Sequence, residues 1–259
     1  MISIITPTFN SDIYLEDCIL SIIHQSYDDY EHIIVDGMST DRTLEIIKKY
    51  ENRYNMRWIS EKDQGMYDAI KKGFEMAKGD IFCWLNSDDM YMPWALQTVS
   101  SVMINPKIQW CTGIPSQFNE FGINYCQCRI IPTYSQKVIK KGLMEGRRLG
   151  CIQQESTFWT KELYVKSGGI NPDYLFAGDY YLWKSFAGYE KLYVVNSILA
   201  GFRVHKGQKS EDRSKYYGEI GMLHTYEKLS SKVKLYSLRR FLHNYFTQKS
   251  IIRINNINF

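Results

Sequence analysis

Strand-like and helix-like segments alternate through the first hundred residues, and this alternation limits the possible folds more than any other sequence feature. Short apolar, β-branched runs predict four strands, at Ile2–Thr6, Glu31–Asp36, Met56–Ser60 and Asp80–Leu85. Apolar residues at helical spacing predict three helices between them, at Tyr14–His24, Ser39–Tyr50 and Gly65–Ala77. Such units pack as βαβ, so the sequence predicts an α/β, Rossmann-like fold with a mostly parallel central sheet flanked by helices. Ser11 or Asp12 is the expected cap of the first helix.

The pattern is less regular beyond Pro106. Strand-like pieces lie around Trp110–Gly113, Tyr125–Ile131 and Lys191–Asn196, and helices are expected at Lys161–Ser167 and Asp179–Ala187. Residues 136–150 contain three glycines and two adjacent arginines. This segment fits a mobile basic loop or a solvated helix with a glycine cap, and both interpretations stay open.

Several protein classes are disfavoured at once. No run approaches the ~20 apolar residues that cross a bilayer, and the N-terminus lacks the features of a secretion signal. The six cysteines include no C-x-x-C pair, and Cys126 and Cys128 have no partner set, so a zinc site is not expected. We therefore expect a cytoplasmic chain with free thiols.

The charge is uneven along the chain, although its net value is only +4. Residues 228–259 contain seven basic and no acidic side chains, which leaves the rest of the chain mildly acidic. Apolar residues recur at helical spacing within this basic segment, as in helices that lie on anionic membranes. A helix docked on its own domain or on a second subunit, in a homo-oligomer, explains the pattern equally well. A nucleic-acid partner is not expected, because the body has no basic stripe.

Polar clusters follow each of the first four predicted strands. They lie at Thr6–Asn10, Asp36–Asp41, Glu61–Gly65 and Asn86–Asp89. Any one of them could be a turn, since these residue types favour turns. Because ligands bind beyond the carboxyl ends of parallel strands, four such clusters in succession predict a binding site.

The glycine-rich signatures of nucleotide sites are absent, with no G-x-G and no Gly-Lys pair. Asp88 and Asp89 suggest another way to neutralise phosphates. Adjacent carboxylates can hold a hard divalent cation, Mn²⁺ or Mg²⁺, which screens a pyrophosphate. The alternative is a helix N-cap before Met90.

Four ordered segments carry a family resemblance: TPTFN, IIVDGMSTDRT, EKDQGMYDA and GDIFCWLNSDD. Together they resemble the family 2 glycosyltransferases with a GT-A fold over roughly residues 1–205. The further segment QQESTFW resembles bacterial transferases that build O-antigen, capsule or exopolysaccharide repeat units. The resemblance implies a catalytic domain at 1–205, with a nucleotide-binding half (1–105) and an acceptor-binding half (106–205). A basic helical extension follows at 206–259.

The resemblance also implies roles for residues of the first half. It assigns nucleotide binding to Thr6, Pro7, Thr8, Asn10, Asp36, Asp63, Gly65, Asn86, Ser87 and Asp88. Asp36 matches the acid that reads the base, usually uracil, although it could instead end a strand and cap the next helix. Asp88 and Asp89 match the acidic metal motif, in which the family often has Asp where Asn86 stands.

In the second half, Asp179 matches the catalytic base, with Gly178 where the family often has another acid. His205 matches a position near the diphosphate or metal, and Gln154, Glu155 and Trp183 are candidates for acceptor binding. Each has a structural alternative: a helix cap for Asp179, a surface histidine for His205, sheet lining for Gln154 and Glu155, and core packing for Trp183.

The implied reaction is metal-dependent transfer of one sugar, with inversion, from a nucleotide-sugar, usually a UDP-sugar, to a glycan acceptor. A lipid-linked acceptor would suit peripheral attachment to the inner face of the membrane. A carboxylate can take the proton of the acceptor hydroxyl as it attacks the anomeric carbon. The processive motif Q-x-x-R-W is absent. A nucleotidyltransferase, a carbohydrate-binding module without turnover and a membrane scaffold are the rival interpretations.

Overall fold

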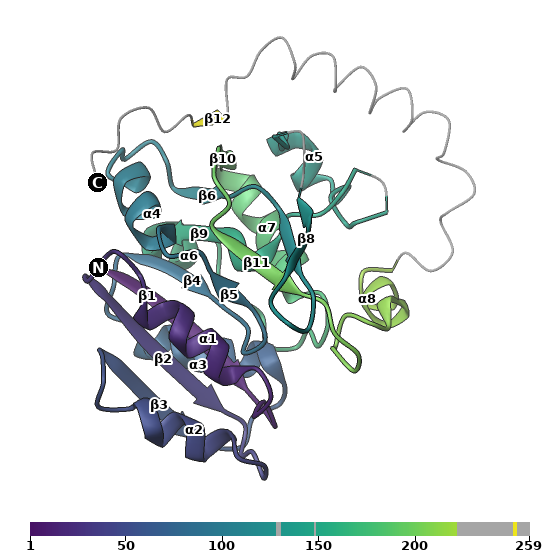
Figure 1. Cartoon of the computed structure of the whole chain (residues 1–259). Helices are drawn as coiled ribbons and strands as arrows, with labels where there is room; N and C mark the ends of the chain where they lie inside the picture. Colours follow the sequence, from purple (N-terminus) through teal and green to yellow (C-terminus); the bar gives the residue numbers. More distant parts are fainter. Residues whose placement is uncertain (128–130, 148, 222–250, 253–259) are drawn as a thin grey trace.

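The computed structural model describes residues 1–127, 131–147, 149–221 and 251–252 (Figure 1). Its larger sheet has the strand order β12-β10-β6-β9-β4-β1-β2-β3. All pairings in it are parallel except those of β9, which runs antiparallel to both β4 and β6. The prediction of an α/β fold with a mostly parallel sheet is therefore confirmed.

The first half of the chain follows the predicted alternation closely. Its strands and helices are β1 (Ile2–Thr8), α1 (Leu15–Ile23), β2 (Tyr30–Asp36), α2 (Thr43–Tyr50), β3 (Met56–Ser60), α3 (Met66–Met76) and β4 (Ile81–Trp84). Every residue of β1 and β2 is buried, as expected for central parallel strands covered by helices on both faces. Figure 1 shows α1 and α3 against this part of the sheet.

One local prediction and one alternative interpretation in this half are wrong. Neither Ser11 nor Asp12 caps α1, whose N-cap position is Tyr14 with no side-chain hydrogen bond. The backbone N–H groups of Ser11 and Asp12 instead donate to side chains around the start of α2. Ser11 donates to Thr43 Oγ1, and Asp12 donates to Asp41 Oδ2. The suggested helix cap before Met90 is also wrong, because the chain there enters strand β5 (Met90–Tyr91) and α4 begins only at Ala95.

A second sheet was not predicted from the sequence. Its order is β5-β11-β7-β8, with β7 (Ser116–Phe118), β8 (Asn124–Gln127) and β11 (Ala200–Arg203). Each strand is only two to four residues long, too short for an alternating pattern to be recognised. This sheet matters for the site, because it brings β11 beside the loop that follows β4.

The remaining elements of the second half are α4 (Ala95–Met103), β6 (Trp110–Thr112), α5 (Gln136–Lys140), the 3-10 turn η1 (Gln154–Ser156), β9 (Thr157–Thr160), α6 (Lys161–Lys166), α7 (Gly178–Tyr189), β10 (Tyr193–Val195) and α8 (Arg213–Glu219). The helix alternative for 136–150 holds only for α5. The chain then turns at Gly142, whose φ of 68° is left-handed.

Two apolar layers cover the larger sheet. Ile5, Ile70 and Trp84 belong to the layer beneath α3 and α7, and Ile4, Cys18 and Val99 to the layer beneath α1 and α4. Four indole rings stack or meet edge to face in the first layer, those of Trp84, Trp110, Trp159 and Trp183. This aromatic core anchors β4 and β9, the strands that lead into and out of the polar edge described below.

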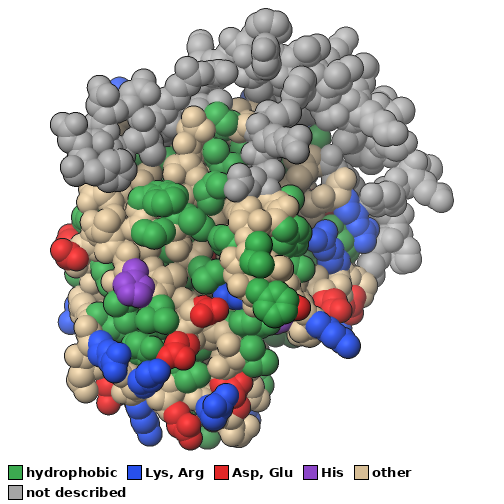
Figure 2. All heavy atoms as spheres, in the orientation of Figure 1, with side chains coloured by type: hydrophobic (Ala, Val, Ile, Leu, Met, Phe, Trp, Pro, Cys, Tyr) green, Lys and Arg blue, Asp and Glu red, His purple; other side chains and the backbone are tan. Residues whose placement is uncertain are grey.

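On the face drawn in Figure 2, Lys and Arg side chains lie among Asp and Glu side chains over the lower part of the molecule. In the described part of the chain, no helix is both long and apolar enough to span a membrane. Most of the predicted basic extension, and all of its amphipathic helix, lies outside the described residues. The described part of the chain beyond residue 205 is the segment 206–221, which contains α8, and strand β12 (Ile251–Ile252). The division of the chain at residue 205 stays a prediction.

Candidate functional site

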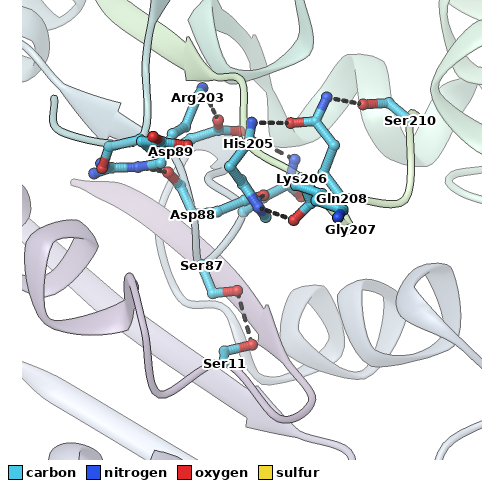
Figure 3. Close-up of polar contacts among 12 residues, drawn as sticks. Ser11, Ser87, Asp88, Asp89, Arg203, His205, Lys206, Gly207, Gln208 and Ser210 are labelled. Carbon is cyan, nitrogen blue, oxygen red and sulfur yellow. Dashed lines mark hydrogen bonds and ion pairs between the residues drawn. The ribbon is translucent and has the colours of Figure 1, made fainter. Parts of the chain in front are cut away.

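The loops that follow β1, β2 and β4 are bonded to one another at the carboxyl edge of the sheet. The backbone N–H of Asn10 donates to Ser39 Oγ at 2.8 Å, and the N–H of Thr40 donates to Asn10 Oδ1 at 2.9 Å. Ser87 Oγ lies 3.0 Å from Ser11 Oγ (Figure 3). Asn10 adopts a left-handed φ of 50°, which asparagine tolerates better than most residues. The structure thus brings the predicted clusters together.

Asp36 is fully buried at the end of β2 and is saturated with hydrogen bonds. Its carboxylate accepts from Thr8 Oγ1, from Ser60 Oγ and from both the N–H and the hydroxyl of Ser39. It does not cap α2, whose N-cap position is Arg42. The alternative of a capping acid is therefore wrong, and Asp36 fixes the loop that carries Ser39.

Thr6 and Pro7, two of the predicted nucleotide contacts, lie within β1 and are buried there. Thr6 is fully buried, and its Oγ1 lies 2.8 Å from His32 Nε2 in the core. Pro7 is buried beside Val35 of β2. The strand runs two residues longer than predicted, to Thr8, and this places both side chains inside the sheet layers.

Asp63 and Gly65 form the turn that opens α3. Asp63 Oδ1 accepts the Gly65 N–H at 2.9 Å, and Gly65 has a φ of 129° that glycine tolerates. A Cβ at Gly37 would lie only 2.5 Å from Asp63 Oδ2 and 3.4 Å from the Phe9 ring. Gly37 thus permits the β2 loop to approach Asp63. Phe9 is 64% exposed here, an aromatic face among polar loops that the sequence interpretation left out.

Asp88 and His205 form a pair across the two sheets (Figure 3). His205 Nε2 lies 3.0 Å from Asp88 Oδ2, and His205 Nδ1 lies 3.0 Å from the carbonyl oxygen of Lys206. A neutral imidazole that donates from Nδ1 to this carbonyl directs the lone pair of Nε2 at the carboxylate. An imidazole nitrogen and a carboxylate oxygen placed in this way can hold a divalent cation between them, and carboxylate is a donor that Mn²⁺ prefers.

In the described part of the chain, no three His, Cys, Asp or Glu side chains are grouped as a metal site. Asp88 and His205 would be the two protein ligands that hold Mn²⁺ or Mg²⁺. Such ions commonly bind with one or two carboxylates and complete their coordination with water and substrate phosphates. The residues present therefore fit a metal that shares its coordination with a diphosphate.

Asp89, the predicted second metal ligand, is instead buried and hydrogen-bonded within the protein. It is 1% exposed, and its two oxygens accept from the backbone N–H of Arg203 at 2.8 Å and from Asn86 Nδ2 at 3.2 Å. Burial, with the nearby Asp88 charge, raises the pKa of Asp89. Its carboxyl therefore holds β11 against the Asn86–Asp89 loop.

Arg203 is a structural residue that the sequence interpretation missed. It is fully buried and donates to the carbonyl oxygen of Asp88 at 2.7 Å, to that of Glu120 at 3.0 Å and to Asp17 Oδ2 at 2.9 Å. Its guanidinium also lies 4.5 Å from the centre of the Tyr14 ring. The only sequence signal was one arginine within the otherwise apolar run before His205.

Gln154 and Glu155 lie in η1, directly beneath the Asn86 loop. Gln154 Nε2 donates to the carbonyl oxygen of Trp84 at 2.5 Å, and its Oε1 accepts from Asn86 Nδ2. Glu155 is 2% exposed, and burial together with the charges of Asp88 and Asp179 raises its pKa to about 8. Burial therefore favours the protonated form of the Glu155 carboxyl.

Asp179 lies in the first turn of α7, whose N-cap position is Ala177. The alternative in which Asp179 is the capping residue is therefore wrong. The hydroxyl of Tyr67 donates to Asp179 Oδ1 at 3.3 Å. Burial raises the pKa of Asp179 to about 6, although the Tyr180 N–H, the Tyr67 hydroxyl and the nearby Lys209 oppose the shift. A carboxylate with this pKa is suited to general base catalysis near neutral pH.

Trp183, a predicted acceptor contact, lies instead in the hydrophobic core. It is 3% exposed and packs between Trp84 and Trp110, with ring centroids 5.9 Å away on each side. Both faces of its indole are therefore occupied, and the structural alternative of core packing describes it.

Comparison with known proteins places these observations in a family context. A model described as "Glycosyl transferase family 2" matches residues 3–146. A "PGL/p-HBAD biosynthesis glycosyltransferase" of Mycobacterium bovis is 41% identical over 91 residues, 34% of this chain and 36% of that protein. The "Putative teichuronic acid biosynthesis glycosyltransferase TuaG" of Bacillus subtilis is 37% identical over 94 residues, 35% of this chain and 37% of that protein. The matched region spans little more than a third of these relatives.

Among solved structures, S. aureus TarS 1-349 in complex with UDP superimposes with a TM-score of 0.65 at 17% identity, over 95% of this chain and 72% of that chain. The mannosyltransferase PcManGT from Pyrobaculum calidifontis, in complex with GDP-Man and Mn²⁺, gives a TM-score of 0.65 at 16% identity, over 85% and 61%. At these identities the likeness is one of fold.

Proposed function

Since this chain belongs to glycosyl transferase family 2, whose model matches residues 3–146, we propose that it transfers one sugar from a nucleotide donor to a glycan acceptor. One observation carries the proposal. The segment that begins at His205 reaches the residue that holds the base, since Lys209 Nζ lies 5.6 Å from the centre of the Tyr67 ring, and this supports a single site for the metal pair and the base. Asp88 pairs with His205 there, and Asp179 accepts from Tyr67.

The loops after β1, β2 and β3 are the proposed site for the nucleoside. Asn10, Ser39 and Asp63 lie there with the exposed ring of Phe9, which offers a stacking face to a base. We propose uridine as this nucleoside, and the UDP complex of the structural neighbour TarS supports this assignment. Thr8 and Asp36 act through the loop that they fix rather than by exposed contacts.

The diphosphate belongs beside Asp88, Ser87 and His205 in this proposal. A bound Mn²⁺ or Mg²⁺ there would supply positive charge against the diphosphate as it leaves. The Mn²⁺ complex of the neighbour PcManGT supports metal use. Asn86 and Gln154 keep the Asn86–Asp89 loop in place through their mutual hydrogen bond.

Asp179 is the proposed base of a single displacement. Its carboxylate takes the proton of the acceptor hydroxyl, whose oxygen forms the new bond to the anomeric carbon. The bond from that carbon to the diphosphate oxygen breaks, and the nucleoside diphosphate leaves with the electron pair. One displacement inverts the anomeric centre, so we propose an inverting hexosyltransferase.

The acceptor is proposed to be a glycan of a bacterial surface polysaccharide, such as O-antigen or capsule, carried on a lipid. The likeness to a PGL/p-HBAD and a teichuronic acid biosynthesis glycosyltransferase supports polysaccharide or glycolipid synthesis. Gln154 and Glu155 are themselves buried, so they would act on the acceptor through the η1 turn that they form rather than by exposed contacts. The site would then work on the inner membrane surface, with residues 228–259 as the proposed contact.

A donor screen tests this function. The chain is incubated with Mn²⁺ and with UDP-, GDP- or CDP-sugars, and release of the nucleoside diphosphate is measured. We expect release from a UDP-sugar, strongly reduced in Asp179→Asn and retained in Asp173→Asn, which alters an exposed acid of the loop before α7. Release from none of the donors, with or without added glycan lipids, would contradict the proposal.

A further inference from the structure

Glu219, at the end of α8, makes an unusual set of contacts. Its carboxylate accepts three consecutive backbone N–H bonds, from Leu175 at 2.7 Å, Phe176 at 2.9 Å and Ala177 at 2.6 Å. In addition, its own backbone carbonyl oxygen accepts from Tyr181 Oη at 3.2 Å. Charge-assisted bonds of this length are among the stronger polar contacts in proteins. One side chain of α8 therefore fixes the backbone of a distant loop.

The loop that Glu219 holds leads directly into the predicted base. Ala177 is the N-cap residue of α7, and Asp179 follows two positions later. The same stretch lies close to the donor half, because a Cβ at Gly65 would lie 3.3 Å from Leu175 Cδ2 and one at Gly178 would lie 2.8 Å from the Tyr67 ring. The position of Asp179 is thus set by a short loop between α3 on one side and Glu219 on the other.

Glu219 belongs to a segment that begins at the metal pair. This segment runs from His205, beside Asp88, to Glu219 at the end of α8, which Figure 1 shows at the right of the molecule. A second anchor holds α8 from the opposite side, where Tyr217 Oη donates to the carbonyl oxygen of Glu145 at 3.3 Å. Within the segment, His205 is fixed by its own bonds to Gln208 and Lys206.

We propose that Glu219 is a positioning residue for the base Asp179, and that it acts by holding the Leu175–Ala177 backbone. This inference rests on the proposed function, since it presumes that Asp179 takes the acceptor proton. Without the carboxylate, three neighbouring N–H groups lose their acceptor and the loop relaxes toward water. A displacement of about 1 Å at a catalytic group can lower the rate about a hundredfold, whereas ground-state donor binding need not change.

The test compares Glu219→Ala and Glu219→Gln with the wild type and with Asp173→Ala. Asp173 is an exposed acid of the same loop, so it controls for loss of charge there. UDP release is measured with UDP-glucose, UDP-galactose and UDP-GlcNAc, using the donor that the wild type turns over fastest. For each variant, UDP affinity is measured by calorimetry, and hydrogen exchange is measured at the backbone amides of residues 175–177.

In Glu219→Ala we expect kcat to fall about tenfold to a hundredfold, with KM and UDP affinity within twofold of the wild type. Exchange of the 175–177 amides should accelerate while the amides of β1 and β2 stay protected, which shows that the protein remains folded. Glu219→Gln, which keeps one acceptor oxygen, should recover part of kcat. Asp173→Ala should match the wild type.

Unchanged exchange at 175–177, or a kcat within twofold of Asp173→Ala, would overturn the proposal. A proportional loss of kcat and UDP affinity would also overturn it, because Glu219 would then support the site as a whole. If the wild type neither binds UDP nor turns over any donor, the proposed function fails and the role at the base fails with it. The exchange data, which need no substrate, still report whether Glu219 holds the loop.

Discussion

The hydroxyl of Tyr67 donates a hydrogen bond to Asp179 Oδ1 over 3.3 Å and so joins the first turn of α3 to the first turn of α7. The two residues are 112 positions apart in the sequence. The helix that follows the donor loops thereby orients the base. Tyr67 is buried, and the same hydroxyl also contacts the carbonyl oxygen of Phe176, so its position is well defined.

Removing this hydroxyl should shift the pH dependence of catalysis. Burial raises the pKa of Asp179 to about 6, and the Tyr67 hydrogen bond opposes that rise by stabilising the carboxylate. In Tyr67→Phe the pKa of Asp179 should rise further, so the ascending limb of the kcat profile moves to higher pH. The rate at pH 6 should fall more than the rate at pH 8. Tyr189→Phe, in an exposed residue of α7, the helix that carries Asp179, should leave the profile unchanged.

Replacing the base itself should separate chemistry from donor binding. Asp179→Asn keeps the shape of the side chain but cannot take a proton, so transfer should fall by about 10²–10⁴-fold. UDP affinity, measured by calorimetry, should remain within about threefold, because Asp179 acts on the acceptor side. A variant with more than a tenth of wild-type activity would remove Asp179 from the role of base.

Asp89 should matter for stability rather than as a metal ligand. Asp89→Ala leaves the buried Arg203 N–H without an acceptor and removes one of the two acceptors of Asn86 Nδ2. Urea unfolding should show a loss of about 2–4 kcal/mol, from the unpaired N–H, the lost second bond of Asn86 and a small cavity. Asp28→Ala, which alters an exposed acid, should change stability by less than about 0.5 kcal/mol. Equal effects of the two substitutions would contradict the described geometry.

Glu155 should make stability depend on pH between about 4.5 and 8. Its pKa rises from 4.5 to about 8 on folding because the carboxyl is buried, so the folded state binds the extra proton in this window. The free energy of unfolding should therefore decrease as pH rises, by up to about 1.4 kcal/mol per unit.

Glu155→Gln mimics the neutral acid and should remove this slope. Glu162→Gln, in an exposed residue of α6, should retain it. Parallel stability curves for the wild type and Glu155→Gln would show that Glu155 does not hold a proton in the folded protein.

The carboxyl edge of the sheet, formed by the loops after β1 to β4, was predictable because it depends on local sequence patterns. Regular βαβ spacing located β1 to β4, and the loop after each strand carried polar residues that the sheet topology then brought together. Asn10, Asp63 and Asp88 lie where the spacing put them. Thr6 was misjudged because a strand boundary shifted by two residues turns a loop side chain into a core side chain.

The residues that support this edge were not predictable, because their partners are remote. Arg203 reaches Asp17, 186 positions away, and Glu219 reaches the loop before Asp179. Nothing in the local sequence of either residue indicates those contacts. Trp183 looked like a sugar platform, since a buried and an exposed tryptophan at helical spacing have the same sequence pattern.

The central claim is that Asp88 and His205 hold a divalent cation that binds a uridine diphosphate donor. Calorimetric titration of UDP, with Mn²⁺ and with EDTA, tests it most directly on the wild type, Asp88→Asn and His205→Ala, with Asp28→Asn as control. We predict UDP binding that Mn²⁺ tightens at least tenfold, and loss of this gain in both site variants but not in the control. UDP binding that is equal with Mn²⁺ and EDTA, or that both variants retain in full, would contradict the account.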